Sequence, residues 1–273
     1  MKKIFTVLTI YLLCYVLRFY EYFILRTDQT WVGEAIVHKL LGIVILFVAA
    51  KLLQFTVQEI GFTKQNCLRN LVKGLAFGIG VFVVAYAVET LIVIAQGRFD
   101  SLQIYVSAYA IDQNVGHRTE LLFFVICIVG NIVNVVMEEG LFRGLFAKIL
   151  EKKYSFIVSA IIASILFGFW HVIGPVRNFY DGTSGMGGMI ANVITLLVTS
   201  ALVGFKFAML TEMTGNHYMA MGDHFVNNTI VNLLHVVSDS GADEMMVVRV
   251  SIAQSVSFIL VLIRYIRLSR QKG

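Results

Sequence analysis

The chain is built of long apolar runs separated by short polar connections. A helix needs about 20 mostly apolar residues to cross a membrane, and each run approaches or reaches that length. The runs are continuous instead of alternating, which disfavours a β-barrel, and backbone groups in lipid must bond within their own segment. The pattern therefore predicts about eight transmembrane helices, at Ile4–Leu25, Ala35–Phe55, Gly74–Ala95, Leu121–Leu141, Ser155–Ile173, Met189–Leu210, Tyr218–Val237 and Met245–Ile266.

The composition supports this prediction. Apolar residues make up 58% of the chain and charged residues only 14%, with a mean hydropathy of +0.79. Soluble domains carry about 25% charged residues, so an ordinary soluble globule and a disordered chain are both excluded. We expect an all-α polytopic membrane protein, with residues 1–273 forming a single transmembrane domain. The segment 174–188 is rich in glycine and holds the single proline, which predicts a mobile loop.

Basic residues indicate the orientation of the helices. Most Lys and Arg lie in the connections that share a side with both termini, so the positive-inside rule places both termini in the cytoplasm. The net charge of +5 is thus explained by topology in a plasma-membrane protein, and no nucleic-acid partner is expected. The first apolar run is expected to stay as an uncleaved helix, because no small-residue cleavage site follows it.

The first cluster of ionisable residues within the apolar runs is Glu138, Glu139 and Arg143. A charge at the bilayer centre costs about 2.5–3.5 kcal/mol on insertion scales, so such clusters point to function. Glu139 and Arg143 are four residues apart and can pair on a helix. The Glu138 side chain points about 100° away from that of Glu139, so it is free for another role. The alternative is a helix end that emerges into the headgroups.

Two further clusters follow along the chain. His171 ends a run without other ionisable groups, and Phe167 lies one turn earlier on the same face. His224 and Asn228 are also four apart and face the same way. The alternatives are an interfacial aromatic belt for the first and interhelical hydrogen bonds for the second. Glu89, Arg18 and Glu21 lie in apolar runs as well, where helix packing is the simplest account.

Helix geometry indicates that the three clusters can meet. Counted from the basic turn near residue 152, Glu138 and His171 lie about 21–27 Å along an antiparallel helix pair. His224 lies roughly 15 Å from the turn near Gly215 by the same rise, a gap that tilt can close. The sequence therefore predicts a Glu, two His and an Asn inside an apolar bundle.

These side chains have the chemistry for amide hydrolysis. A buried carboxylate with a neighbouring His can take a proton from water, which then attacks a carbonyl group. Another His and an Asn can donate hydrogen bonds to the oxyanion that develops. No Ser or Cys lies in a convincing nucleophile context, so a covalent mechanism is disfavoured.

At this point the sequence resembles a known family. Its motifs Glu138-Glu139-xxx-Arg143, Phe167-xxx-His171 and His224-xxx-Asn228 match, in order and spacing, the EExxxR, FxxxH and HxxxN motifs of the CPBP intramembrane proteases. That family is also called the Abi or CAAX-protease family and is related to the Rce1 endoprotease. The resemblance covers roughly residues 118–237, which we expect to form the catalytic core.

The resemblance implies a glutamic-type intramembrane endopeptidase without a metal or other cofactor. Glu138 would activate water with help from His171, and His224 and Asn228 would form the oxyanion hole. Glu139, Arg143 and Phe167 would support them. Substrates would be membrane-embedded or membrane-associated peptides or proteins, in peptide maturation, regulated proteolysis or bacteriocin self-immunity. Cleavage of prenylated CAAX tails need not follow.

Three other functions stay open. A Glu and two His can form a catalytic zinc site, although HExxH is absent. The same polar residues can form a proton or ion path, although no inverted repeat is evident. A non-catalytic immunity or sensor-partner protein on the same scaffold is the third.

Overall fold

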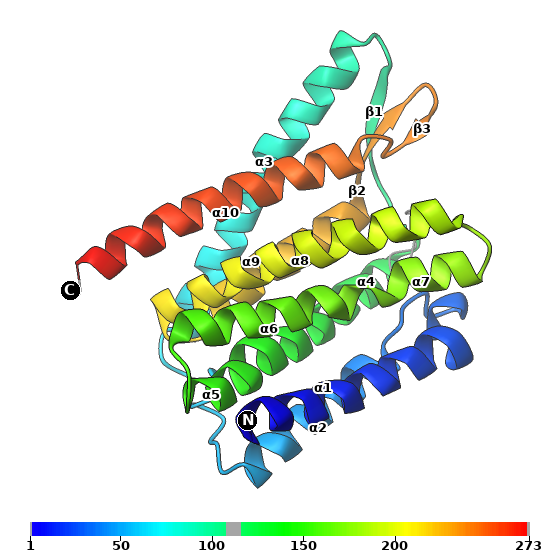
Figure 1. Ribbon diagram of the computed structural model, residues 1–273. Coiled ribbons are helices and arrows are strands. Elements are labelled where there is room, and N and C mark those ends of the chain that lie inside the picture. The colour runs from blue at the N-terminus through cyan, green and yellow to red at the C-terminus, as the bar shows by residue number, and fades with distance from the viewer. Residues whose placement is uncertain (1, 108–115, 272–273) are drawn as a thin grey trace.

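The computed structural model describes residues 2–107 and 116–271, and this part of the chain is mainly helical (Figure 1). The α-helices are α1 (Lys2–Tyr20), α2 (Val37–Leu52), α3 (Cys67–Ala95), α4 (Leu121–Glu138), α5 (Ala147–Glu151), α6 (Phe156–His171), α7 (Ile173–Tyr180), α8 (Met186–Thr214), α9 (Tyr218–Leu233) and α10 (Met246–Arg270). The other elements are the π-helices η1 (Glu21–Leu25) and η3 (Glu139–Phe146), the 3₁₀ turn η2 (Thr27–Gln29), and strands β1 (Phe99–Ile104), β2 (Leu234–Ser238) and β3 (Gly241–Ala242).

The prediction of an all-α polytopic membrane protein is confirmed. Within the described residues, six helical segments are long and apolar enough to cross a membrane: Lys2–Gln29, Cys67–Ala95, Leu121–Glu151, Phe156–Tyr180, Met186–Thr214 and Met246–Arg270. The other two predicted spans correspond to α2 and α9. Each has 16 residues and so a length of about 24 Å, short of a hydrocarbon core of about 30 Å.

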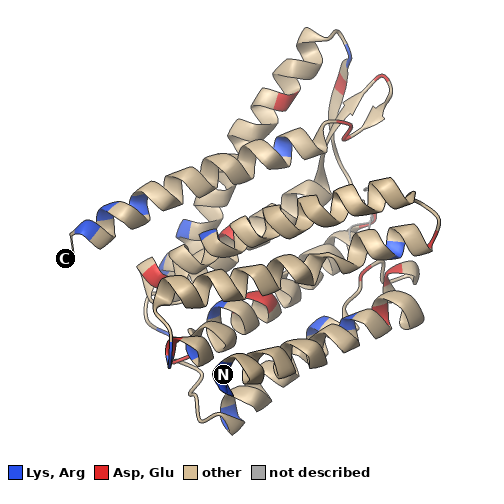
Figure 2. Cartoon of the chain, viewed as in Figure 1, with Lys and Arg blue, Asp and Glu red and all other residues tan. Residues whose placement is uncertain are grey.

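The two ends of the bundle differ. Figure 1 shows the N-terminus, the C-terminus and α5 towards one end, and the small sheet and the α7–α8 connection towards the other. Lys and Arg are more frequent at the end with the termini (Figure 2). The arrangement is that of a chain that crosses the bundle an even number of times.

The bundle is apolar outside and polar within. Large apolar side chains such as Leu12 and Val83 are more than half exposed, while Arg18 and Glu89 on the same helices are buried. Buried ion pairs accompany them: Glu89 lies 2.8 Å from Arg249, and Lys206 lies 2.8 Å from Asp223. This is the expected distribution for a protein in lipid, where a buried charge needs a partner and an apolar surface costs nothing.

Glu21 and Arg18 do not pair with each other. Glu21 lies 2.6 Å from His38 Nδ1 and accepts a hydrogen bond from the Val37 N–H, which joins the end of α1 to the start of α2. Arg18 instead points towards α6, with its guanidinium 4.4 Å from the Trp170 ring. Both residues thus connect helices, and Arg18 reaches the polar centre of the bundle.

A three-stranded antiparallel sheet is a departure from the predicted helices. Its order is β1-β2-β3, and it lies at the end of the bundle opposite the termini (Figure 1). The expected span Tyr218–Val237 therefore ends as a helix at Leu233. His235, inside the predicted span, lies on β2, where it stacks on Tyr105 at 3.8 Å and contacts Asp243. Contacts with side chains distant in sequence thus determine the strand here, where the apolar pattern alone predicts a helix.

The prediction of a loop at residues 174–188 is largely wrong. Its first half continues as α7, and only residues 181–185 form the turn before α8. Pro175 lies in the first turn of α7, where a missing N–H costs no intrahelical bond. Buried Arg177 fixes α7 through Asp28, at 2.9 Å, and Asp181, at 3.1 Å. The glycines correctly predict the turn, but ion pairs formed in the tertiary structure stabilise the helix before it.

Helices α3 and α9 pack closely through glycines, which places the third motif. A Cβ at Gly222 of α9 would lie 2.6 Å from the Leu71 carbonyl oxygen. A Cβ at Gly74 of α3 would meet the Met219 carbonyl oxygen well inside contact distance. Small residues at such crossings allow backbones to approach in membranes. His224 and Asn228 therefore depend on this contact for their depth in the bundle.

We expect Gly74→Ala to destabilise the protein, because backbone atoms cannot yield as a flexible side chain can. Overpacking of this kind costs about 1–3 kcal/mol. The matched control is Gly80→Ala on the same helix, where an added Cβ meets nothing within 4 Å. Thermal unfolding in detergent should show a lower Tm for Gly74→Ala only. Equal melting temperatures would contradict the close packing of α3 on α9.

Candidate active site

The first motif lies where α4 changes into the π-helix η3. Glu138 ends α4 and Glu139 begins η3, and both carboxylates are buried, at 2% and 0% exposure. π-helical turns are rare and often mark functional sites. Their i→i+5 turns advance less along the axis per residue than α turns, so Glu138 lies nearer the end with the termini than an α-helical rise predicts. This change of pitch helps Glu138 reach the level of His224.

Glu139 is held by the partner that the sequence predicts and by a second one. The Arg143 Nε lies 3.4 Å from Glu139 Oε2, and the His224 Nδ1 lies 2.8 Å from Glu139 Oε1. Arg143 also donates to the Gly204 carbonyl and places its guanidinium 4.0 Å from the centre of the Phe167 ring. Glu139 therefore links the first motif to the third, and Arg143 links it to the second.

Glu138 has one engaged oxygen and one free oxygen. Trp170 Nε1 donates to Glu138 Oε1 at 2.9 Å, and the nearest Arg18 nitrogen, Nη1, lies 3.9 Å from the same oxygen. Glu138 Oε2 accepts no hydrogen bond from the described residues and lies 3.5 Å from His224 Nε2. Glu138 thus keeps one carboxylate oxygen available to accept a proton.

Sequence reasoning did not identify Trp170 as part of the site. An interfacial belt was the alternative considered for this Trp-His pair, yet Trp170 is only 1% exposed. A buried Trp requires a hydrogen-bond acceptor for its indole N–H, and a carboxylate on the preceding antiparallel helix is such an acceptor. This need for an acceptor is the sequence signal that could have identified Trp170 as part of the site.

The orientation of His171 leaves one ring nitrogen free to act as a base. Its Nδ1 donates to the Phe167 carbonyl at 2.8 Å, so a neutral ring carries its lone pair on Nε2. The ring also packs against Phe167, with centroids 4.7 Å apart. Phe167 contacts His171 as the sequence predicts, and it separates this ring from the Arg143 guanidinium.

A cavity of about 210 Å³ gives access to this cluster. Glu138, His171 and Asn228 line it, one residue from each of the three motifs. His224 is not among its lining residues and lies behind Glu138 instead. The other lining residues are Arg18, Tyr22, Glu34, Lys39, Asn131, Asn134, Val231 and Asn232. Four of them come from the first 40 residues, where the sequence shows no motif.

Asn228 is oriented by its neighbour. Asn227 Nδ2 donates to Asn228 Oδ1 at 3.0 Å, and Gln254 Nε2 donates to Asn227 Oδ1 at 2.6 Å. The amide oxygen of Asn228 is thereby engaged, which leaves its N–H₂ group to donate into the cavity. Sequence spacing places Asn227 on another face of α9, and the side-chain bond that joins the two residues could not be predicted from it.

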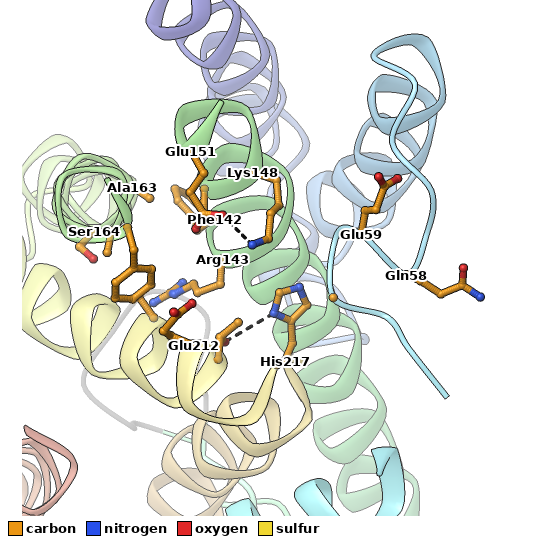
Figure 3. Close-up of a pocket in the computed structure, with 17 residues that line it drawn as sticks. Gln58, Glu59, Phe142, Arg143, Lys148, Glu151, Ala163, Ser164, Glu212 and His217 are labelled. Atoms are coloured by element: carbon orange, nitrogen blue, oxygen red, sulfur yellow. Dashed lines mark hydrogen bonds and ion pairs between the residues drawn. The ribbon is translucent and has the colours of Figure 1, made fainter. Parts of the chain in front are cut away.

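A second polar cavity, of about 190 Å³, lies on the other side of Arg143 (Figure 3). It is lined by the α8–α9 turn, by η3 and α5, by α6 and by the segment around Gly61. His217 in that turn is buried, and its Nε2 contacts the Ile60 carbonyl. Burial lowers the pKa of His217 to about 4, so its ring is neutral at pH 7. Phe167, His171 and Glu138 do not line this cavity, so it is separate from the candidate site.

Metal ligation was also considered. Across residues 2–107 and 116–271, no group of three or more His, Cys, Asp or Glu side chains is arranged to hold a metal ion.

Fold and site together define a class: a polytopic membrane protein whose polar cavity holds a glutamate and a histidine among apolar helices. Residues 120–230 match the family model described as Type II CAAX prenyl endopeptidase Rce1-like. This part of the chain is therefore similar to an Rce1-like domain, and the match supports a CAAX-type membrane protease at the level of the family. A comparison with curated proteins gives no match.

We expect Arg143→Ala to lower stability and activity together. Its removal leaves Glu139 as a buried carboxylate without its cation, a change that costs about 3–5 kcal/mol. The matched control is Lys148→Ala, one turn further on. Its pair with Glu151 is partly exposed, with the two side chains 37% and 24% accessible, and is worth at most about 1 kcal/mol. Thermal unfolding of both variants checks this, and an unchanged Tm for Arg143→Ala would contradict it.

Proposed function

We propose that the chain is a glutamic-type intramembrane endopeptidase that uses Glu138 to activate water. The observation that carries the proposal is the free Oε2 of Glu138 beside a cavity that His171 and Asn228 also line. A carboxylate with one oxygen fixed and the other open is oriented to accept a proton at a defined position. The family match supports a protease, and the geometry supports these residues as its reacting groups.

The proposed reaction begins with a water molecule between Glu138 and the scissile carbonyl group. Glu138 Oε2 takes a proton from the water as its oxygen bonds to the carbonyl carbon, and His171 Nε2 orients the water by accepting its second hydrogen. The tetrahedral intermediate then expels the amine. Protonated Glu138 returns its proton to the leaving nitrogen as the C–N bond breaks, which gives a carboxylic acid and an amine.

The negative charge on the carbonyl oxygen needs donors. Asn228 lines the cavity and its amide oxygen accepts from Asn227, so its N–H₂ group is the proposed donor. His224 is the second proposed donor. It lies between two carboxylates, and the oxyanion would have to approach the Nε2 side of the ring. Such preorganised donors are more effective in a water-poor site than in solution.

The proposed substrates are peptides or proteins embedded in or associated with the bilayer, in peptide maturation, regulated proteolysis or self-immunity. The apolar outer surface of the bundle supports such partners, because they reach the cavity without leaving the membrane. We also propose a plasma-membrane location with both termini in the cytoplasm, which the basic residues at that end support (Figure 2). The proposed reaction needs no metal, because Glu138 and His171 handle the water and its protons, and His224 and Asn228 supply the donors.

Glu138→Gln should abolish cleavage and leave the Tm unchanged, since the amide keeps the shape and can still accept from Trp170. The matched control is Glu151→Gln at the second cavity, which should cleave normally. Membrane peptides from cells that carry each variant are compared by mass spectrometry. A peptide cleaved with the native protein and with Glu151→Gln, but not with Glu138→Gln, is the expected result. Equal peptide profiles would overturn the proposal, and chelator inhibition reversed by zinc would indicate a metalloprotease.

Asn228→Ala should lower kcat by about 10²–10³ and change KM little, because the lost donor acts mainly in the transition state. Asn227→Ala should give a smaller loss, since Asn228 keeps its amide but loses the bond that orients it. The measurement is steady-state kinetics on a fluorescence-quenched copy of the peptide found above. A loss confined to KM would show that Asn228 binds substrate without stabilising the oxyanion.

A further inference from the structure

Arg18 is a buried cation with unused donors at the catalytic cavity. Its side chain is 8% exposed and lines the cavity with Glu138, His171 and Asn228. Its Nη2 donates to the Tyr22 hydroxyl at 3.0 Å, but Nε and Nη1 donate no hydrogen bond to any described residue. Buried donors without acceptors are costly, so their retention in the bundle calls for an explanation.

The position of Arg18 is fixed by its surroundings. Its guanidinium lies 4.4 Å from the centre of the Trp170 ring and 4.9 Å from that of Tyr22, which hold the plane from two sides. Trp170 also donates to Glu138 Oε1, so one indole positions both the carboxylate and the cation. Arg18 Nη1 is 3.9 Å from that oxygen, too far for a hydrogen bond. The guanidinium is therefore held in place without a hydrogen bond to Glu138.

The other cation at the cavity is already neutralised. Lys39 Nζ contacts the Glu34 carboxylate directly, and both residues are buried. Among the described residues that line the cavity, Arg18 is thus the cation with free nitrogens. His224, in contrast, directs both ring nitrogens at carboxylates and lies outside the lining.

We propose that Arg18 donates hydrogen bonds to the carbonyl oxygen of the scissile peptide bond and stabilises the oxyanion as it forms. This inference rests on the proposed peptidase function. As the water oxygen bonds to the carbonyl carbon and Glu138 takes the proton, the C=O electron pair moves to the oxygen. That oxygen accepts from Arg18 in addition to the proposed donors Asn228 and His224, and the guanidinium keeps its protons throughout. Arg18 belongs to α1, outside the matched residues 120–230, so the first helix completes the catalytic site.

The test uses the full-length protein in liposomes and a fluorescence-quenched copy of the peptide whose cleavage depends on Glu138. Arg18→Gln should lower kcat about a hundredfold with little change in KM, and Arg18→Lys should recover part of the loss. The matched control is Arg26→Gln, which removes a cation eight residues later that pairs with Asp181 at 2.6 Å outside the cavity. This control should cleave at the native rate.

The pH dependence of kcat separates substrate contact from an effect through Glu138. If Arg18 served only to keep Glu138 ionised, Arg18→Gln would regain the native kcat at high pH. A loss that persists on the high-pH plateau supports the donor role, and its disappearance there overturns it. If Arg18→Gln does not fold, Arg18→Lys is measured instead, provided that its Tm equals that of the native protein. A kcat below the native value on the high-pH plateau supports the donor role of Arg18. A native kcat on that plateau refutes it.

The two proposals fail in different ways. Absence of any cleavage by the native protein would remove the peptidase function itself. Cleavage that Glu138→Gln abolishes, combined with a native kcat for Arg18→Gln, would remove the role of Arg18 alone.

Discussion

The structure depends on the need to neutralise two adjacent carboxylates in the middle of an apolar bundle. Glu138 and Glu139 are consecutive and buried, and in a medium of low dielectric their charges are tolerated only with partners. The partners come from three other helices: Arg18 from α1, Trp170 from α6 and His224 from α9. Satisfying this one pair of residues therefore fixes how four helices pack around the motif.

The same requirement separates the roles of the two carboxylates. Glu139 Oε1 lies 2.8 Å from the His224 ring, and its Oε2 pairs with Arg143 at 3.4 Å. Glu138 Oε1 accepts from Trp170, and its Oε2 has no hydrogen-bond donor among the described residues. Consecutive residues on a helix point in different directions, so the two carboxylates meet different partners. Under the proposed function, Glu139 supports the fold and Glu138 takes part in the reaction.

Other buried pairs extend this principle through the bundle. Glu89 pairs with Arg249 between α3 and α10, and Lys206 pairs with Asp223 between α8 and α9, so ion pairs add to the apolar contacts among these helices. In lipid the outer surface gains nothing from burial, so specificity of helix packing has to come from polar pairs and from close glycine contacts. Both devices hold α9, the helix that carries His224 and Asn228, through the Lys206–Asp223 pair and the glycine contacts with α3.

From the sequence alone, the class of the protein and three of the residues that line the cavity, Glu138, His171 and Asn228, could be predicted. Continuous apolar runs predicted the membrane helices, and four-residue spacings predicted the Glu139–Arg143 pair and the Phe167–His171 contact, because such local geometry follows from one helix alone. Only the tertiary structure decided the small sheet around His235, the helix α7, the link from Asn227 to Asn228, and the arrival of Trp170 and Arg18 at Glu138. Each of these rests on contacts between residues distant in the chain, where side-chain partners outweigh local preference and no spacing rule applies.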